Sequence, residues 1–374
     1  MTRLKVLAFD YATVSSILGG GAGDGAGVAR PQSLLRQDAM LLEALQADLR
    51  ALPGVELYTM APAAPSPDSA NSVLERFQHC FDACLREADA VWPLACESEF
   101  MLERLSRDIV RASRILLSSP PDTLRVTASK LALARALDDA GVASVATYDP
   151  HTALAQGKGA WVVKPDAGAG CLNTRLFSDQ ATALAWVRAT AAHGYVLQPF
   201  VAGKLGSLSL LCCDGAARVL ACNHERVAMR DNRFHFMGST VNGIDDANGV
   251  LARLGQQVAA ALPALWGYVG VDFILGEHGP VVLDVNPRLT AAYAGLALSI
   301  GCNPAGLVLD LLTRPPSTPA LSASASSAWV SSSPASSAPA APTAALSASS
   351  AAASWPSAQS LPARRAVSVD ISVA

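Results

Sequence analysis

Two groups of residues in this chain of 374 amino acids have the types and spacing needed for chemistry, and the first is a lysine followed by glycines. The apolar run Trp161-Val-Val-Lys164 reads as a strand that ends on the lysine, and the next loop contains Gly168 and Gly170. Glycines let backbone N–H groups approach an anion closely, and the lysine adds a positive charge. The pattern predicts a phosphate-binding loop, with a strand ending in a tight turn as the alternative. No Gly-Lys-Ser/Thr sequence follows, so this is not the P-loop pattern.

The second group consists of three side chains with oxygen atoms. Asp272 lies in Gly-Val-Asp-Phe-Ile, and Asp284 and Asn286 lie in the segment Asp-Val-Asn-Pro-Arg288 that begins twelve residues later. The period of a strand places Asp284 and Asn286 on one face, and a turn at Gly276-Glu-His-Gly279 would put Asp272 on the neighbouring strand. Hard oxygen donors are the ligands that Mg²⁺ requires. A polar hairpin with an Asn-Pro turn is the alternative, but the surrounding residues are too apolar for an ordinary solvated surface.

A weaker signal lies between these groups. The segment Tyr195-Val-Leu-Gln198-Pro-Phe200-Val201 is apolar and contains a rigid proline, so its main chain could bind a flat base while Phe200 and Val201 line its face. A core strand followed by a loop is the commoner explanation for such a segment.

Composition limits the possible partners. Charged residues make up 16% of the chain and the net charge is only −3, so no basic field favours nucleic acid or anionic lipid, and a small-molecule substrate is expected. No stretch reaches the roughly 18 uninterrupted apolar residues of a membrane span. The apolar run Leu4–Phe9 is too short for a signal peptide, so we expect a cytoplasmic protein. The eight cysteines contain no zinc-type Cys-x-x-Cys pair and are expected to be reduced.

Residues 1–120 alternate between strands and helices, which predicts an α/β domain with a small parallel sheet. The expected strands are Leu4–Phe9, Val55–Tyr58, Ala90–Trp92 and Leu116–Ser118, and the expected helices are Ser33–Leu52, Val73–Ala88 and Glu99–Ser113.

Residues 121–313 read as α+β, because most of their strands follow one another through short turns. The expected strands are Trp161–Lys164, Tyr195–Gln198, Leu208–Cys213, Arg218–Asn223, Arg233–Met237, Val269–Leu275 and Val281–Val285, and the expected helices are Thr127–Ala140, Gln180–Ala192 and Val250–Leu265.

Residues 314–374 are rich in Ser, Ala and Pro and are predicted to be a disordered tail, because they lack the large apolar side chains needed to offset ordering. The final segment Ala366–Val373 alternates as a strand would, which leaves open whether it docks on a partner or has no specific role.

The order of these motifs resembles that of the ATP-grasp superfamily: Lys130, Lys164 with its glycine loop, Gln198 with its apolar neighbours, Asp272, and Asp284 to Arg288. The resemblance implies an ATP-grasp fold with an N-terminal Rossmann-like pre-ATP-grasp domain (1–120) and an ATP-grasp domain (121–313). The latter would comprise a nucleotide lid subdomain (121–200) and a metal and substrate subdomain (201–313). The run Asn286–Tyr293 and the opening Phe9-Asp-Tyr11 are similar to tyramine-glutamate ligases of methanofuran biosynthesis, which have relatives in methylotrophic bacteria.

The resemblance also implies a role for each motif residue. Lys130 and Lys164 would touch nucleotide phosphates, under a closing loop that contains Gly168 and Gly170. The adenine hinge would be formed by Gln198, Phe200 and Val201. Mg²⁺ or Mn²⁺ would be bound by Asp272, Asp284 and Asn286, and Arg288 would steady the transferred phosphoryl group or the acyl phosphate. Asp284 stands where the family often has Glu, and no glutamate for the ribose follows Gly203.

The implied function is an ATP-dependent ligase that activates a carboxylate as an acyl phosphate and joins it to an amine, with glutamate and tyramine or tyrosine as substrates. The oligomeric state is left open, with a homodimer as one option. A nucleotide-binding protein without catalysis is one alternative. A dinucleotide-dependent oxidoreductase is another, because Gly21-Ala-Gly23-Asp-Gly-Ala26 fits a Gly-x-Gly-x-x-Ala pattern, but it lies too far from the strand before it and the helix after it. His224 and His235 lack a zinc-binding frame and either border the acceptor site or are exposed hairpin residues.

Overall fold

The structure is a computed structural model that describes residues 3–18, 32–60, 72–95, 100–152, 154–190, 194–313 and 364–371. All of these belong to one compact unit, and the rest of this section concerns that unit alone. The Gly21–Ala26 motif and residues 314–363 of the expected tail lie outside the described residues.

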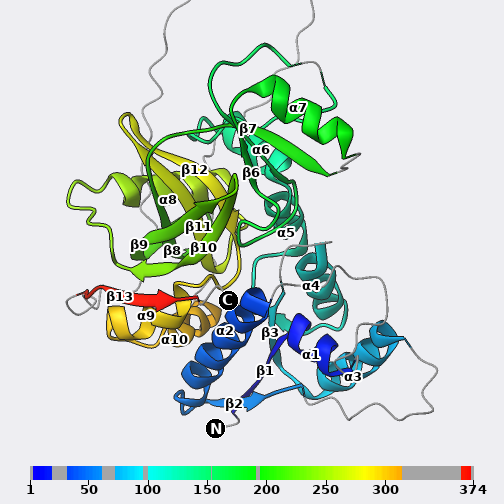
Figure 1. Cartoon of the computed structure of the whole chain (residues 1–374). Helices are drawn as coiled ribbons and strands as arrows, with labels where there is room; N and C mark the ends of the chain where they lie inside the picture. Colours follow the sequence, from blue (N-terminus) through cyan, green and yellow to red (C-terminus); the bar gives the residue numbers. More distant parts are fainter. Residues whose placement is uncertain are drawn as a thin grey trace, which may run out of the picture. The chain divides into compact units, whose positions relative to one another are not determined.

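The N-terminal part is a four-stranded parallel sheet in the order β2-β1-β3-β4, coloured blue to cyan in Figure 1. The strands are β1 (Leu4–Asp10), β2 (Val55–Tyr58), β3 (Ala90–Leu94) and β4 (Ile115–Leu116), and the helices are α1 (Tyr11–Leu18), α2 (Gln32–Arg50), α3 (Val73–Glu87) and α4 (Met101–Arg111). Phe9, Phe77 and Phe81 pack together in its core. A capping box between Ser72 and Glu75 begins α3, as the sequence pattern favours. The predicted parallel sheet is confirmed.

One predicted helix is wrong in its extent. The sequence predicted a helix from Thr127 to Ala140, whereas the chain forms α5 (Pro121–Ala128) and α6 (Lys130–Asp139) with a break at Ser129. The Ser129 hydroxyl accepts from Ala132 N as an N-cap and donates to the Asp166 carboxylate at 2.7 Å. Asp166 also accepts from Leu131 N, so a residue far along the chain fixes where α6 begins.

The second sheet has nine strands, eight of them in the order β12-β11-β8-β9-β10-β6-β5-β7. Its strands are β5 (Trp161–Pro165), β6 (Arg175–Phe177), β7 (Tyr195–Pro199), β8 (Lys204–Cys213), β9 (Ala216–Arg230), β10 (Arg233–Val241), β11 (Gly267–Gly276), β12 (Gly279–Asn286) and β13 (Val367–Asp370). Its helices are α7 (Gln180–Ala189), α8 (Val250–Ala261), α9 (Tyr293–Ile300) and α10 (Pro304–Leu309), and a 3-10 turn (Asp310–Thr313) follows α10. The predicted antiparallel arrangement is confirmed, while β6, α1, α9 and α10 were not predicted.

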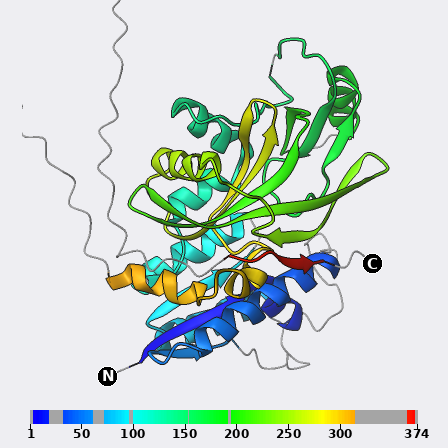
Figure 2. The same ribbon diagram turned by 90° about the vertical axis from the view of Figure 1, so that its left-hand side faces the viewer.

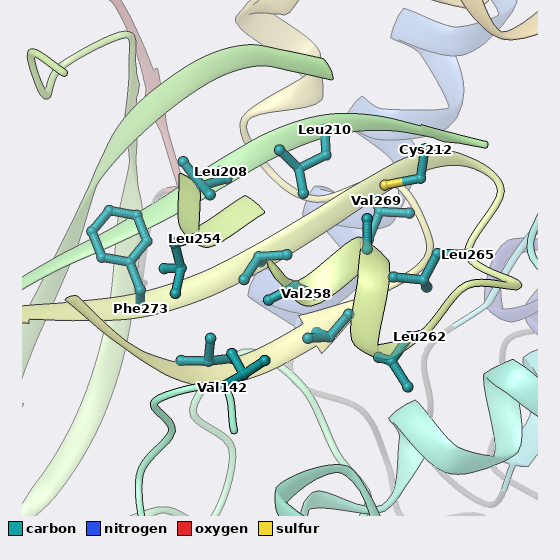
Figure 3. Packing of buried hydrophobic residues seen from close by; sticks show 14 of the residues in the cluster. Val142, Leu208, Leu210, Cys212, Leu254, Val258, Leu262, Leu265, Val269 and Phe273 are labelled. Atoms are coloured by element: carbon teal, nitrogen blue, oxygen red, sulfur yellow. The ribbon is translucent and has the colours of Figure 1, made fainter. Parts of the chain in front are cut away.

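The core of this part lies between the sheet and α8. Figure 3 shows side chains of β8, β11 and α8 packed together, among them Leu208, Leu210, Val269, Phe273 and Val258. All five are almost completely buried, so β8, β11 and α8 form a rigid base beneath the strands that carry the site residues.

The pairing of β11 with β12 matches the predicted hairpin. Gly276 pairs with Gly279 across the turn at Glu277-His278, and Asp272 pairs with Asp284. A β-bulge follows this pair, because Phe273 is opposite Val282. The register therefore brings the two carboxylates face to face.

The strand β13, red in Figure 1 and dark red in Figure 2, pairs antiparallel with β10. Its residues were expected to belong to the disordered tail, and this expectation is wrong for Val367–Asp370. Two glycines leave room for this strand. A Cβ atom at Gly238 would overlap the Val369 carbonyl oxygen, and one at Gly295 would lie 2.9 Å from Val369 Cγ2. The Arg226 guanidinium donates to Val369 O and pairs with Asp370.

The described cysteines are all free thiols, as the composition predicts. Within the described ranges no single helix is long and apolar enough to cross a membrane. Taken together, α9 and the segment Pro304–Thr313 have the length and composition, but the two are bent by 94° at the break between them.

The alternating burial of β13 provides a matched test of its docking. Val369 is buried and its neighbour Ser368 is exposed. We expect Val369→Asp to lower the free energy of unfolding by about 2 kcal/mol, since the apolar contact of this side chain is lost. Ser368→Asp should change it by less than about 0.5 kcal/mol. Urea unfolding of both variants measures the difference, and equal stabilities would contradict the docked position of β13.

Candidate active site

A cavity of about 380 Å³ lies over the second sheet and gathers all the predicted site residues. They come from α6, from the ends of β5 and β7 with the loops that follow, and from the β11–β12 hairpin and the residues just after it: Lys130, Lys164, Gly168, Gly170, Gln198, Phe200, Val201, Asp272, Asp284, Asn286 and Arg288 all line it. Because these residues are spread over more than 150 positions of the chain, their convergence is a property of the fold.

The carboxylates on the hairpin lie close together without being freely solvated. The Asn286 amide donates to Asp272 Oδ2 at 3.1 Å, and Asp284 and Asn286 are both buried. Burial, together with the negative charges of Glu225 and Asp284, raises the pKa of Asp272 to about 8. This pair of carboxylates therefore favours a cation between or beside them.

The two lysines supply positive charge at the other side of the carboxylates. Lys130 Nζ lies 3.1 Å from Asp284 Oδ2 and donates to Gly168 O at 3.0 Å. Burial and the charge of Lys130 lower the pKa of Lys164 to about 8. Lys130 is thus bonded both to the glycine loop and to the hairpin. A phosphate beside its ammonium group would therefore also lie next to the loop and the hairpin.

Arg288 follows β12 and is tied to the same hairpin. Its guanidinium donates to Asn286 Oδ1 at 3.1 Å and to Leu289 O at 3.2 Å. Asn286 therefore links the arginine to Asp272, because its amide nitrogen donates to the carboxylate and its oxygen accepts from Arg288.

The glycine loop requires glycine at one position in particular. Gly170 has φ +64, and a Cβ atom there would lie 2.7 Å from Leu34 Cδ2 of α2. The left-handed backbone disfavours any side chain at this position, and a Cβ atom would also require the Leu34 methyl group to shift.

The predicted hinge segment has two different parts. Gln198 is buried and its amide donates to Thr147 Oγ1 at 2.8 Å, so this side chain anchors β7. Phe200 is 45% exposed and lines the cavity together with Val201, so these two can cover the face of a flat ligand.

The donor set fits Mg²⁺ rather than a softer metal. Two carboxylates and one amide oxygen leave coordination positions for phosphate oxygens and water. No group of three His, Cys, Asp or Glu residues in the described part of the chain is arranged to hold a metal ion by itself. His224 and His235 are partly buried, and neither lines the cavity.

The polar cavity residues that were not predicted include Glu225 on β9 and Gln37 on α2. Glu225 Oε1 accepts from Ser207 Oγ at 2.5 Å and from Ser239 Oγ at 3.1 Å. The sequence signal for Glu225 is slight, since it consists of one acidic residue in a strand that also contains Asn223, His224 and Arg226.

Comparisons with known proteins agree with this geometry. Residues 127–292 match an ATP-grasp domain family, and residues 56–124 match a pre-ATP-grasp domain family. A search of curated proteins gave no match.

Several solved structures have a similar fold. One is a protein from Archaeoglobus fulgidus assigned to the ATP-grasp superfamily (TM-score 0.60, 21% identity, 82% of this chain and 88% of that chain). The others reported are the L-amino acid ligase from Bacillus licheniformis (0.58, 18%, 83% and 74%) and the D-alanine–D-alanine ligase from Bacillus anthracis (0.56, 14%, 83% and 96%). At sequence identities this low, the similarity to these structures shows the fold alone.

The raised pKa of Asp272 leads to a pH dependence of metal binding. Below about pH 8 the carboxyl is largely protonated, so a cation must displace a proton, and Mn²⁺ affinity should rise by up to about tenfold per pH unit between about pH 6.5 and pH 8 before levelling. Mn²⁺ titration of the nucleotide-free protein measures this. Asp272→Asn should flatten the profile, whereas the exposed-residue control Asp231→Asn should keep it. A flat wild-type profile would contradict the assignment.

Proposed function

We propose that this chain, which belongs to the ATP-grasp superfamily, is an ATP-dependent ligase that joins a carboxylate to an amine through an acyl phosphate. The observation that carries this proposal is the convergence of two lysines, two carboxylates and an asparagine on one cavity within a matched ATP-grasp domain. No Ser-His-Asp or Cys-His arrangement was found in the sequence, and none is needed, because the reaction depends on positioning and charge stabilisation.

The roles of the residues follow from their charges. Lys130 and Lys164 would hold the nucleotide phosphates, and the glycine loop would close over them. Asp272, Asp284 and Asn286 would hold Mg²⁺, which neutralises phosphate charge when bound. Arg288 would stabilise the phosphoryl group as it passes to the substrate carboxylate. The Lys130–Asp284 ion pair keeps the lysine and the metal ligand in position before the nucleotide enters.

The substrates are proposed from the resemblance to tyramine-glutamate ligases: glutamate as the acid and tyramine or tyrosine as the amine, giving a γ-glutamyl amide for a methanofuran-type cofactor. An aromatic amine is supported by the lining of the cavity, because Met229, Phe234 and Phe236 are apolar residues that line it together with Glu225. Tyr293, which belongs to the resembling segment, is buried away from the cavity and donates to Asp48, so it supports the fold.

The proposal predicts ADP release that depends on both an acid and an amine. We expect the purified protein with ATP and Mg²⁺ to release ADP in the presence of glutamate and tyramine, and mass spectrometry should identify the amide. A panel of other amines and acids tests the specificity. Nucleotide binding without ADP release across the panel would indicate a protein that binds nucleotide without catalysis.

The β11–β12 hairpin contains the proposed metal ligands and an exposed control residue, so the metal assignment can be tested within it. We expect Asp284→Ala or Asn286→Ala to lower turnover by roughly a hundredfold or more, because each change removes a preorganised group of the charge-stabilising site. Glu277 lies in the exposed turn of the same hairpin, so Glu277→Ala should leave turnover unchanged. Wild-type ADP release by the Asp284 or Asn286 variants would rule out the metal site.

A further inference from the structure

One charged group of the cavity takes no part in the nucleotide and metal binding proposed above: the carboxylate of Glu225. It lies on β9, between β8 and β10, and its side chain lines the same cavity as Asp272, Asn286 and Arg288. Its position is therefore beside the reaction site, on the wall built by the central strands.

The two carboxylate oxygens of Glu225 differ in their bonding. Oε1 accepts from the hydroxyls of Ser207 on β8 and Ser239 on β10, at 2.5 and 3.1 Å. Ser207 is held in turn by Asn223, whose amide donates to its oxygen at 3.1 Å. Strands on both sides thus fix the side chain in one orientation.

The other oxygen, Oε2, is buried and has no hydrogen-bond partner among the residues that the structure describes. A buried carboxylate oxygen without a donor is unfavourable, and the common resolution is a ligand that donates to it. The fixed orientation leaves Oε2 as the oxygen available to such a ligand.

The neighbouring cations are engaged elsewhere. Arg226, the next residue along β9, donates to Thr240 Oγ1 and Val369 O and pairs with Asp370. Lys130 pairs with Asp284, and Arg288 donates to Asn286. A nucleotide phosphate would be repelled by Glu225, because both are negative.

We propose that Glu225 Oε2 binds the ammonium group of a substrate. The group belongs either to the amine that is joined or to the α-amino group of an amino-acid carboxylate donor, and the choice of these substrates rests on the proposed ligase function. An ammonium supplies both the missing hydrogen-bond donor and the missing positive charge. Glu225 would therefore select cationic substrates over neutral ones of the same shape.

The test compares pairs of probes that differ in the ammonium group. Tyramine is compared with tyrosol, which has a hydroxyl in its place, and glutamate is compared with glutarate. Binding of each probe to the full chain with ADP and Mg²⁺ is measured by calorimetry for wild type, Glu225→Gln and the exposed control Glu277→Gln.

In Glu225→Gln we expect affinity for the ammonium-bearing member of one pair to fall about tenfold to a hundredfold, as for a lost charged hydrogen bond, while its neutral partner is unaffected. The pair that responds identifies the source of the ammonium. Glu277→Gln should bind all four probes as wild type does.

Three results would overturn the proposal. The first is an equal loss of affinity for the charged and the neutral member of a pair, as a distorted variant would give. The second is unchanged affinity in both pairs, or no binding of any probe; the third is weaker Mg²⁺ binding without discrimination between the probes, which would make Glu225 a metal ligand. The ligase proposal fails separately. If wild type selects tyramine or glutamate through Glu225 but releases no ADP, the ammonium site holds and catalysis does not.

Discussion

The register of the β11–β12 hairpin is the constraint on which the site depends. It places Asp272 directly opposite Asp284, so two carboxylates share a small, partly buried volume. Like charges in such a place are unfavourable unless cations accompany them. Lys130 meets Asp284 directly, and Asn286 connects Asp272 to Arg288. A slip of β12 by one residue against β11 would turn Asp284 and Asn286 to the face opposite Asp272, so the three oxygen ligands would no longer lie together.

The same ion pair joins elements that are distant in the chain. Lys130 is the first residue of α6, and α6 begins there because Ser129 and Asp166 bind its first turn. Asp166 follows β5, the strand that carries Lys164. The start of α6, the end of β5 and the hairpin are therefore positioned together, which explains how two lysines far apart in sequence come to lie over one pair of carboxylates.

The convergence of Asp272, Asp284 and Asn286 could be predicted from the sequence because its signals are local. A two-residue turn and a period of two were enough to place Asp284 and Asn286 on one face opposite Asp272. The break at Ser129 was missed because it depends on Asp166, and Glu225 was missed because Ser207 and Ser239 lie on other strands. Alternation indicated a strand at the end of the chain, but it could not identify β10 as the strand that β13 pairs with.

Glu225 and β13 are connected through Arg226. Side chains alternate along β9, so Glu225 faces the cavity while Arg226 turns toward β13. If Arg226 were free to approach Glu225, it would neutralise the carboxylate and compete with a cationic ligand. Asp370 and the Val369 carbonyl hold the guanidinium instead. A strand from the end of the chain thus fixes where this positive charge lies. Burial has the larger effect on the pKa of Glu225 and raises it, whereas the guanidinium in that position lowers it, so the docked strand supports the ionised form of this carboxyl.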